Sequence, residues 1–311
     1  MIQESFCIHP RPPFRLDLTV WALRRRARNQ IDQWDGAMYT RVLLIDQVPV
    51  KVEVLQPHSP SPDLQVNIWS PEPRVGLSTR VQEVLQRMLG FSLDLTGFYT
   101  LAEHDPTMSA LAQRFVGMKP PRFPSLFEAL LNAFACQQVT LEVGLLLLNR
   151  LTETYGLSFA DGQTISHAFP RPEEIAGASI EDLRMLGFSR QKARAILELA
   201  TRLTQEPHAL SPLEGMNGDA VREMILSLRG VGRWTAEYVL LRGLGRLETF
   251  PGDDVGAQRN LQRLLHLAEK PAYETIKALT APWFPYAGFI YFHLLLDALE
   301  KQGVVQDKAQ D

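Results

Sequence analysis

Two adjacent carboxylates, Asp253 and Asp254, follow the glycine turn Gly230-Val231-Gly232, with one predicted helix in between. A carboxylate can stabilise developing positive charge, and it can orient or deprotonate water. Glycines turn tightly and let backbone amides come close to another molecule. The pattern therefore predicts a catalytic carboxylate beside a site for a phosphodiester backbone. The alternative is that the aspartates only cap the helix VGAQRNLQRLL that follows them, a position that aspartate favours.

Two predicted helices flank the glycine turn and must position it. Residues 221–228 have helical spacing, and a second helix is expected to begin near Arg233. The first-turn amides of that second helix have no partners within the helix, and they carry the positive end of its dipole. We therefore expect an anion at this turn, and a phosphate diester fits.

The motif L-x-G-V-G-x-x-T-A at residues 228–236, followed by F-P-x-D-D at residues 250–254, resembles the helix-hairpin-helix (HhH-GPD) superfamily of DNA glycosylases. Its variant R-W-T-A-x-Y resembles the bacterial 3-methyladenine DNA glycosylase II (AlkA-like) branch. The resemblance extends over residues 107–296 and is weak in the first hundred residues. It implies an enzyme that flips a damaged base out of double-stranded DNA and breaks its N-glycosidic bond.

The resemblance also assigns roles to single residues. It makes Asp254 the catalytic carboxylate and leaves Asp253 as the cap. It implies no cofactor and no catalytic metal, although the carbonyls near Leu228 and Gly230 are expected to be able to hold a monovalent cation. The residues implied to bind the DNA backbone are Gly230, Val231, Gly232, Arg233 and Thr235.

Trp234 decides the subclass. Relatives that also cut the DNA strand carry lysine here, and an indole cannot form an imine. We therefore expect a monofunctional enzyme that leaves an abasic site. Tyr238 follows at i+4, so both rings can share one helix face. The resemblance places both in the base pocket, where electron-rich rings would attract a cationic base. The alternative for each is ordinary core packing.

Two further residues are candidates for the DNA-facing side of the pocket. Gln138, on what reads as one long apolar helix with Gln137, is implied to be the wedge that fills the gap left by a flipped nucleotide. Its alternative is a polar helix face or a satisfied buried amide. Trp21, on a basic helical stretch over residues 21–28, is a candidate pocket wall or an ordinary packing residue.

The C-terminal segment departs from the family pattern. Trp283 and Pro285 still match, but Ala287 and Leu295 stand where larger or aromatic side chains are expected. The loss of ring area predicts a wider pocket and leaves the preferred base open. His293 is expected to lie in the core rather than in the pocket.

Composition restricts the remaining function classes. A hydrophobic content of 45% with 22% charged residues is ordinary for a globular protein. The formal net charge of −3 means that DNA contact depends on local groups rather than on a basic field. Only Cys7 and Cys136 are present, which argues against a disulfide framework, a zinc site or a four-cysteine iron–sulfur cluster. With no apparent signal peptide and no long apolar run, we expect a cytoplasmic monomer without membrane contact.

The expected fold class is α+β. Residues 1–78 alternate like strands in YTRVLLI, VPVKVEVL and LQVNIWS, which predicts an antiparallel sheet with a helix or two. Residues 79–300 change to helical spacing and predict an all-α body. The resemblance implies that this body is the glycosylase part, with two helical lobes and the active-site cleft between them. Residues 183–200 form a second helix, glycine turn and helix that should pack on the first. Residues 301–311 are expected to be a polar tail.

The function best supported by the sequence is monofunctional excision of alkylated purines of the 3-methyladenine and 7-methylguanine type. Two alternatives stay open. One is the same fold with a different damaged-base preference, such as hypoxanthine or an oxidised purine, and the other is a non-catalytic lesion binder. A dinucleotide-binding site is excluded, because Gly230-Val231-Gly232 follows a helix and lacks the third glycine.

Overall fold

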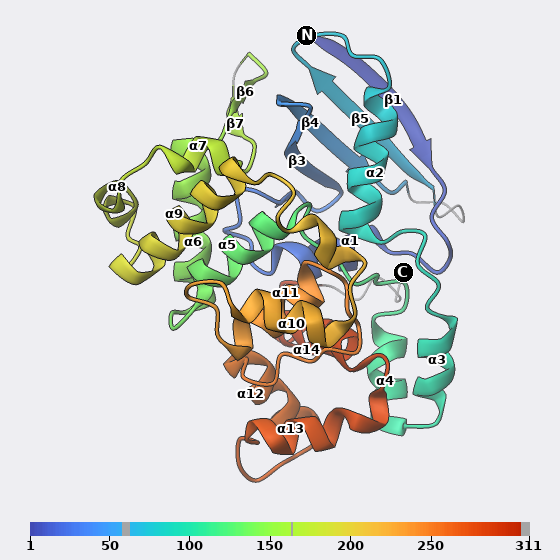
Figure 1. The fold of residues 1–311 in the computed structure, drawn as a ribbon. Helices are drawn as coiled ribbons and strands as arrows, with labels where there is room; N and C mark the ends of the chain where they lie inside the picture. The colour runs from blue at the N-terminus through green and yellow to red at the C-terminus, as the bar shows by residue number, and fades with distance from the viewer. Residues whose placement is uncertain (58–62, 163, 306–311) are drawn as a thin grey trace.

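The computed structural model describes residues 1–57, 63–162 and 164–305. An antiparallel sheet forms one side of the molecule, and helices from the rest of the chain pack beside and below it (Figure 1). The predicted α+β class is confirmed. Part of the expected tail, residues 306–311, and the proline-containing segment 58–62 lie outside the described residues.

The sheet has five strands in the order β1-β5-β4-β3-β2. The three runs predicted from their alternation form β3, β4 and β5, and along β4 the side chains of Val50, Val52 and Val54 all point into the core. β1 was not predicted; it pairs with β5 along its whole length. The strands are β1 (Ile2–Ile8), β2 (Gln33–Trp34), β3 (Met38–Ile45), β4 (Val48–Leu55) and β5 (Leu64–Ser70).

Two helices join the sheet to the rest of the molecule. α2 (Leu77–Leu89) lies across the sheet in Figure 1, so the expected domain boundary at residues 78 and 79 falls inside an element of the sheet layer. α1 (Leu16–Arg24) packs against the C-terminal helix. The basic helical stretch predicted over residues 21–28 is shorter than expected: the helix ends at Arg24, and both Arg24 and Arg25 are buried.

The helical body is not purely helical, which corrects the all-α expectation. A short hairpin of β6 (Ser158–Ala160) and β7 (Ile165–His167) extends from it and packs Phe159 against Val42 of the sheet. The helices are α3 (Thr96–Glu103), α4 (Pro106–Arg114), α5 (Leu126–Cys136), α6 (Leu141–Tyr155), α7 (Pro172–Ala176), α8 (Ile180–Met185), α9 (Arg190–Gln205), α10 (Gly218–Leu226), α11 (Arg233–Arg242), α12 (Val255–Leu264), α13 (Tyr273–Thr280) and α14 (Ala287–Glu300), with 3-10 turns at Ser211–Glu214 and Ala281–Trp283.

The long helix expected around Gln137 is two helices. α5 ends at Cys136, Gln138 adopts a left-handed backbone with φ of 54°, and Thr140 caps α6 by accepting from the amide of Val143. A non-glycine residue in this region of backbone space is uncommon. The glutamines therefore stand in a turn between two helices rather than on a helix face.

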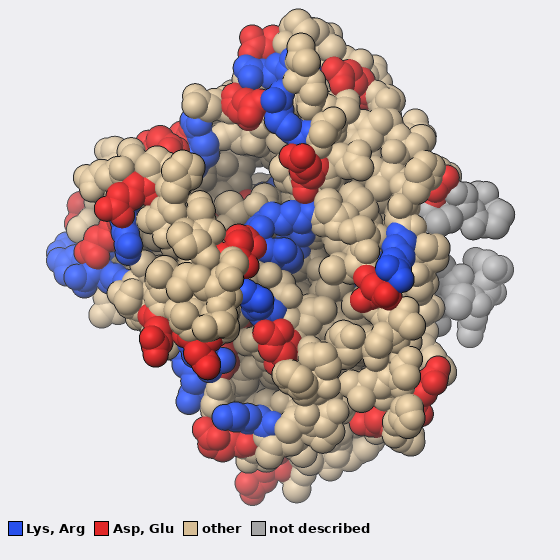
Figure 2. All heavy atoms as spheres, turned by 45° about the vertical axis from the view of Figure 1, so that its right-hand side comes forward, with Lys and Arg blue, Asp and Glu red and all other residues tan. Residues whose placement is uncertain are grey.

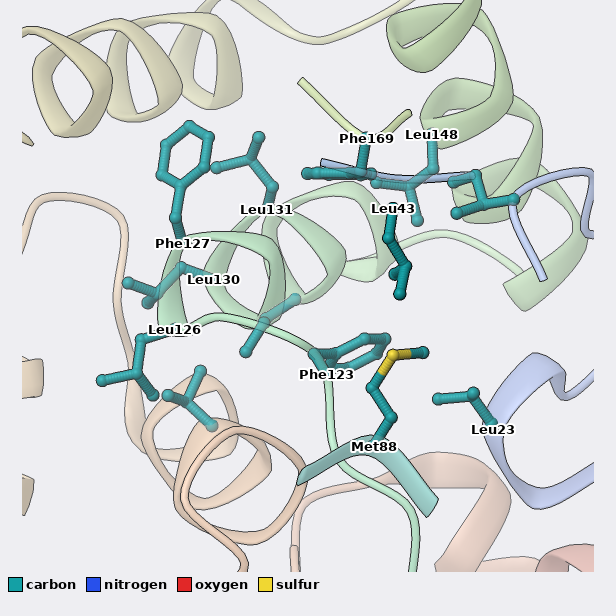
Figure 3. Close-up of a cluster of buried hydrophobic side chains, with 14 of the residues drawn as sticks. Leu23, Leu43, Met88, Phe123, Leu126, Phe127, Leu130, Leu131, Leu148 and Phe169 are labelled. Atoms are coloured by element: carbon teal, nitrogen blue, oxygen red, sulfur yellow. The ribbon is translucent and has the colours of Figure 1, made fainter. Parts of the chain in front are cut away.

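Two hydrophobic cores hold the elements together. The larger one joins the sheet to α2, α5, α9 and α11, and Figure 3 shows part of it around Phe123, Met88 and Leu43. The smaller one surrounds α14. His293 is fully buried there between aromatic rings, as predicted, with Nδ1 bonded to the carbonyl of Phe289. Burial lowers the pKa of His293 to about 4.

The second helical hairpin, α8 and α9, is present as predicted. Gly187 makes its left-handed turn, with φ of 105°. It packs on the first hairpin, where a Cβ added at Gly230 would lie 2.9 Å from the Cβ of Ala195. The first hairpin thus has a fixed support underneath it.

Candidate active site

The hairpin between α10 and α11 uses its two glycines differently. Gly230 turns the chain with φ of 77°, a left-handed conformation that favours glycine. Gly232 has φ of −106° and caps α11; a Cβ added there would meet nothing within 4 Å. Gly230 is therefore required by the turn itself, whereas Gly232 leaves open space where another molecule can approach the first amides of α11.

Groups on α5 and α9 hold this hairpin from behind. Nε2 of Gln137 donates to the carbonyl of Gly230 at 2.7 Å and to Oγ1 of Thr235 at 2.8 Å. Lys192 donates to the carbonyl of Gln137. Thr235 is buried and its hydroxyl accepts from Gln137, so it supports the hairpin, and its contact with the DNA backbone stays a prediction.

The carbonyls proposed for a monovalent cation each have one partner within the protein. The carbonyl of Leu228 accepts from the amide of Val231 at 3.2 Å, and that of Gly230 accepts from Gln137. Each carbonyl oxygen has a second lone pair. The cation site stays a prediction.

The helix cap expected from Asp253 is provided by Asp254 instead. Asp254 caps α12, with Oδ1 accepting from the amide of Ala257 at 2.8 Å. Asp253 is no cap; it forms a bidentate ion pair with the partly exposed Arg233, at 2.6 and 3.0 Å. The expectation that Asp253 provides the cap is therefore wrong, because α12 begins at Val255, as the sequence suggested, and Asp254 is the residue directly before it.

The second carboxylate oxygen of Asp254 faces aromatic donors. Nε1 of Trp234 donates to Oδ2 at 3.1 Å, and the hydroxyl of Tyr291 lies 3.4 Å from the same atom. Asp254 is thus fixed by a helix terminus on one side and by two ring systems on the other. Both oxygens of the carboxylate are therefore oriented by hydrogen-bond donors.

Tyr238 lies behind Trp234 on the same helix face, as its i+4 spacing predicted. The ring centroids are 5.2 Å apart, and Tyr238 is buried. Burial raises the pKa of the Tyr238 hydroxyl, and the charge of Asp254 acts in the same direction, while the guanidiniums of Arg25 and Arg242 oppose the shift. The hydroxyl therefore remains protonated at neutral pH.

Tyr291 and Arg25 are site residues that the sequence reasoning missed. Tyr291 belongs to α14, and its contact with Asp254 restores aromatic surface that the departures at Ala287 and Leu295 had suggested was lost. Tyr291 could have been identified from the sequence, because it lies four residues, or about one helical turn, before Leu295, where an aromatic side chain was expected. Arg25 donates to the hydroxyl of Tyr238 at 2.8 Å, a contact that no local pattern announces.

A second group of contacts positions the turn that carries Asp254. The buried Glu237 accepts from the amide of Gly252 at 3.1 Å and from the hydroxyl of Tyr273 at 2.6 Å. Gln258 donates to the carbonyl of Gly252 at 2.9 Å. The ring of Tyr273 lies so close that a Cβ at Gly252 would come within 2.8 Å of it. Both sides of the turn are therefore held by side chains.

Glu237 is the buried acid at the centre of this network. Burial raises the pKa of Glu237, and its bonds to Tyr273 and Gly252 only partly offset that rise. Burial, together with the bond to Glu237, raises the pKa of Tyr273 to about 12. The guanidinium of Arg233 lies 3.6 Å from the centroid of the Tyr273 ring. The network thus links the hairpin to the aspartate turn.

The remaining predicted residues lie at the edge of this group. Gln138 is exposed in the turn between α5 and α6, a placement that suits a wedge better than the helix face would have. Trp21 is half-buried against the core around α14, with the guanidinium of Arg24 at 4.8 Å from its ring. Trp283 is buried and bonded to Asp105, so it serves the core.

Over the described residues, no cluster of three or more His, Cys, Asp or Glu side chains could hold a metal ion. A cleft of about 650 Å³ lies elsewhere, between the β3–β4 hairpin and the start of α5, and contains none of the predicted site residues. Figure 2 shows acidic and basic side chains interspersed on one face. Within the described part of the chain, no helix is both long and apolar enough to cross a membrane.

The chain was compared with known proteins. Residues 131–285 match the family model described as the HhH-GPD superfamily base excision DNA repair protein. A DNA-3-methyladenine glycosylase of Bacillus subtilis is 31% identical over 201 residues, which cover 65% of this chain and 66% of that protein. DNA-3-methyladenine glycosylase 1 of Schizosaccharomyces pombe is 30% identical over 145 residues, covering 46% of this chain and 59% of that one.

The solved structure of a 3-methyladenine DNA-glycosylase from Archaeoglobus fulgidus has a TM-score of 0.82 at 25% identity, covering 96% of this chain and all of that one. The likeness therefore includes the sheet as well as the helical body. The chain spans just under two thirds of the length of the Bacillus subtilis relative.

Proposed function

Because this chain belongs to the HhH-GPD superfamily of base excision DNA repair proteins, we propose that it is a DNA N-glycosylase of the 3-methyladenine glycosylase type. Its substrate is double-stranded DNA that contains an alkylated purine, of the 3-methyladenine or 7-methylguanine kind. Its products are the free base and an abasic site. The relatives above are 3-methyladenine glycosylases, which supports an alkylated purine as the substrate.

The observation that carries this proposal is the setting of Asp254. Breaking an N-glycosidic bond builds positive charge on the deoxyribose, and a fixed anion beside the sugar stabilises that charge. Asp254 is held by the amide of Ala257 and the indole of Trp234, so its carboxylate needs little reorganisation during the reaction. A cationic alkylated base leaves as a neutral molecule, so one carboxylate can suffice.

We assign the enzyme to the monofunctional class. The position where strand-cutting relatives carry lysine is occupied by Trp234, which donates its only N–H to Asp254. Lys192, an amine close to the hairpin, donates to the carbonyls of Ala135 and Gln137. An amine held in this way supports the hairpin and is poorly placed to attack a sugar.

DNA would be held by the open amides at Gly232 and by Arg233, and the target nucleotide would be flipped toward Trp234 and Tyr238. Gln138, exposed at the turn before α6, would fill the gap in the duplex. We expect the protein to act as a monomer. Cys7 and Cys136 are both free thiols, which fits a reducing compartment such as the cytoplasm.

The experiment is a base-release assay. The protein is incubated with duplexes carrying a single 7-methylguanine or 3-methyladenine, and abasic sites are then cleaved with alkali. We expect strand breaks at the lesion only after alkali, and none in the undamaged duplex. Tight binding to the lesion without any base release would instead support a non-catalytic lesion binder.

A further inference from the structure

Arg25 is a buried cation that has no role in the reaction proposed above. It follows α1 with φ of 64°, a left-handed backbone that costs free energy for a residue other than glycine. Its side chain reaches into the helical body, where it donates to the hydroxyl of Tyr238 at 2.8 Å and to Oδ1 of Asn132 at 2.8 Å. A strained backbone and a buried charge thus coincide at the residue whose guanidinium lies behind Tyr238.

No carboxylate of the described residues forms an ion pair with this guanidinium, and its Nε is buried without a partner there. A second buried cation stands nearby. Arg242 donates to the carbonyls of Ala22 and Leu23, and its guanidinium lies 5.7 Å from the ring of Tyr238. Two buried guanidiniums that form no ion pair within the described residues therefore lie behind one aromatic ring.

The hydroxyl of Tyr238 connects this charge to the site. It accepts a hydrogen bond from Arg25, so its own proton is free to be donated, and it donates to none of the residues that the structure describes. Arg25 polarises this O–H group, because a donor that itself receives a charge-assisted bond becomes a stronger donor. Tyr238 thus presents a directed donor whose acceptor is not within the described protein.

Four residues together form one wall with opposite charges at its ends. Asp254 bonds to Trp234 at 3.1 Å, Trp234 lies 5.2 Å from Tyr238 between ring centroids, and Tyr238 bonds to Arg25 at 2.8 Å. Cleavage of a glycosidic bond separates charge in the same sense, with the sugar becoming positive and an uncharged base becoming negative. The wall is therefore complementary to that charge separation.

We propose that Arg25 is a specificity-determining residue that, through Tyr238, extends the enzyme's range to uncharged purines with a carbonyl at position 6, such as hypoxanthine. This inference rests on the proposed function. In the step, the N9–C1′ bond breaks and its electron pair stays on N9, delocalised toward O6, which accepts from Tyr238. Water adds to C1′ and loses a proton, and the base anion takes up a proton.

A cationic base such as 7-methylguanine has no need of this assistance, because it departs as a neutral molecule. Removing Arg25 should therefore change the ratio of the two activities, whereas general damage to the fold would lower both alike. This ratio is the readout that a merely structural role would not move.

The experiment measures single-turnover base release from two matched duplexes, one with hypoxanthine and one with 7-methylguanine. We expect Arg25→Met to lower the hypoxanthine rate about tenfold or more relative to the 7-methylguanine rate, as for the loss of one transition-state donor. Tyr238→Phe keeps the ring and should change the ratio in the same direction, which covers the case in which Arg25→Met does not fold. Arg25→Lys, which keeps the charge, should recover part of the hypoxanthine rate.

Arg24→Met is the matched control. Arg24 is also buried, but it bonds to the carbonyls of Trp34 and Ala27 rather than to Tyr238, so its loss should leave the ratio unchanged. Equal losses on both bases in Arg25→Met and Tyr238→Phe would overturn the inference, as would a wild-type enzyme that releases 7-methylguanine but never hypoxanthine. A wild-type enzyme that releases neither base would instead refute the proposed function, and this inference with it.

Discussion

The indole nitrogen of Trp234 lies 3.1 Å from Oδ2 of Asp254, so the first aromatic ring of the proposed base pocket and the proposed catalytic carboxylate are directly joined. The other oxygen of Asp254 accepts from the amide of Ala257. The carboxylate therefore has a fixed orientation before any DNA arrives. Substitutions at Asp254, at its neighbours and in the turn that supports it can measure separately what the charge and the position of this carboxylate contribute to base release.

Asp254→Asn should abolish base release and leave duplex binding intact. Asparagine still caps a helix, so α12 should keep its stability, but the anion beside the sugar is lost. We expect the single-turnover rate to fall by about a hundredfold or more, as for other lost transition-state electrostatics. The measurement is base release with enzyme in excess, alongside a binding titration with the same duplex.

Asp253→Asn is the matched control for that variant. It breaks only the partly exposed ion pair with Arg233, which should cost no more than about 1 kcal/mol of unfolding free energy. Wild-type base release by Asp254→Asn, or complete loss of base release in Asp253→Asn, would show that Asp254 is not the catalytic carboxylate.

The enzyme should not cut the DNA strand itself, because Trp234 stands where a lyase needs an amine. Borohydride is added to the protein with lesion-containing or abasic duplex, and the mixture is separated under denaturing conditions. No covalent protein–DNA adduct should form. An adduct would show that another amine, with Lys192 the first to test by Lys192→Met, reaches the sugar.

Gly232→Val should fold normally and yet weaken binding to every duplex. Its backbone is extended and a Cβ there meets nothing within 4 Å, so the added side chain fills only the space where a phosphate would lie. Gly230→Ala is the contrasting variant: it should lose stability, because φ is 77° and the Cβ would press on Ala195. Thermal unfolding and binding titrations measure the two effects.

The salt dependence of wild-type binding tests the same surface. With about three to four phosphate contacts by cations, the log–log slope should be shallower than about −4. A steeper slope, or normal binding by Gly232→Val, would place the phosphate site elsewhere. The segment at residues 21–28 is not a ready substitute, because Arg24 and Arg25 are buried.

Glu237→Gln should slow base release without weakening DNA binding. An amide can accept from Gly252 or from Tyr273 but opposes the other donor with its own NH2 group, so the turn before Asp254 loosens. We expect the single-turnover rate to fall between about tenfold and a hundredfold. Tyr273→Phe should have a smaller effect in the same direction, since Gly252 keeps its acceptor.

Hydrogen exchange of residues 250–256 gives a measurement of this effect that does not depend on activity. Faster exchange there in Glu237→Gln, with unchanged exchange in α9, would support a positioning role. Unchanged exchange together with an unchanged rate would show that the Asp254 turn is held by other contacts.

His293 should make the fold sensitive to acid. Its pKa is lowered from 6.5 to about 4 by burial, so the unfolded chain binds a proton that the folded protein excludes. Stability from this group is complete above pH 6.5 and is lost as pH falls toward 4, by about 3 kcal/mol in total. His293→Leu should flatten this part of the stability curve in urea titrations at several pH values. An equal slope in both proteins would contradict the buried neutral imidazole.

The sequence by itself determined the features that depend on neighbours along the chain. The alternation in β3, β4 and β5, the glycine at the hairpin and the i+4 placement of Trp234 and Tyr238 are local properties, and each is present in the structure. The family motif also rests on a short continuous segment. These features could be predicted because backbone geometry and side-chain period act over a few residues.

Only the tertiary structure decided the features that depend on distant partners. β1 becomes a strand because β5 is available to pair with it, and Tyr291 meets Asp254 because α14 packs beside α12. Arg25 belongs to a run of basic residues in the sequence, but it is buried against Tyr238, 213 residues away. Burial and charge pairing are set by elements that meet only on folding, so local spacing carries no information about them.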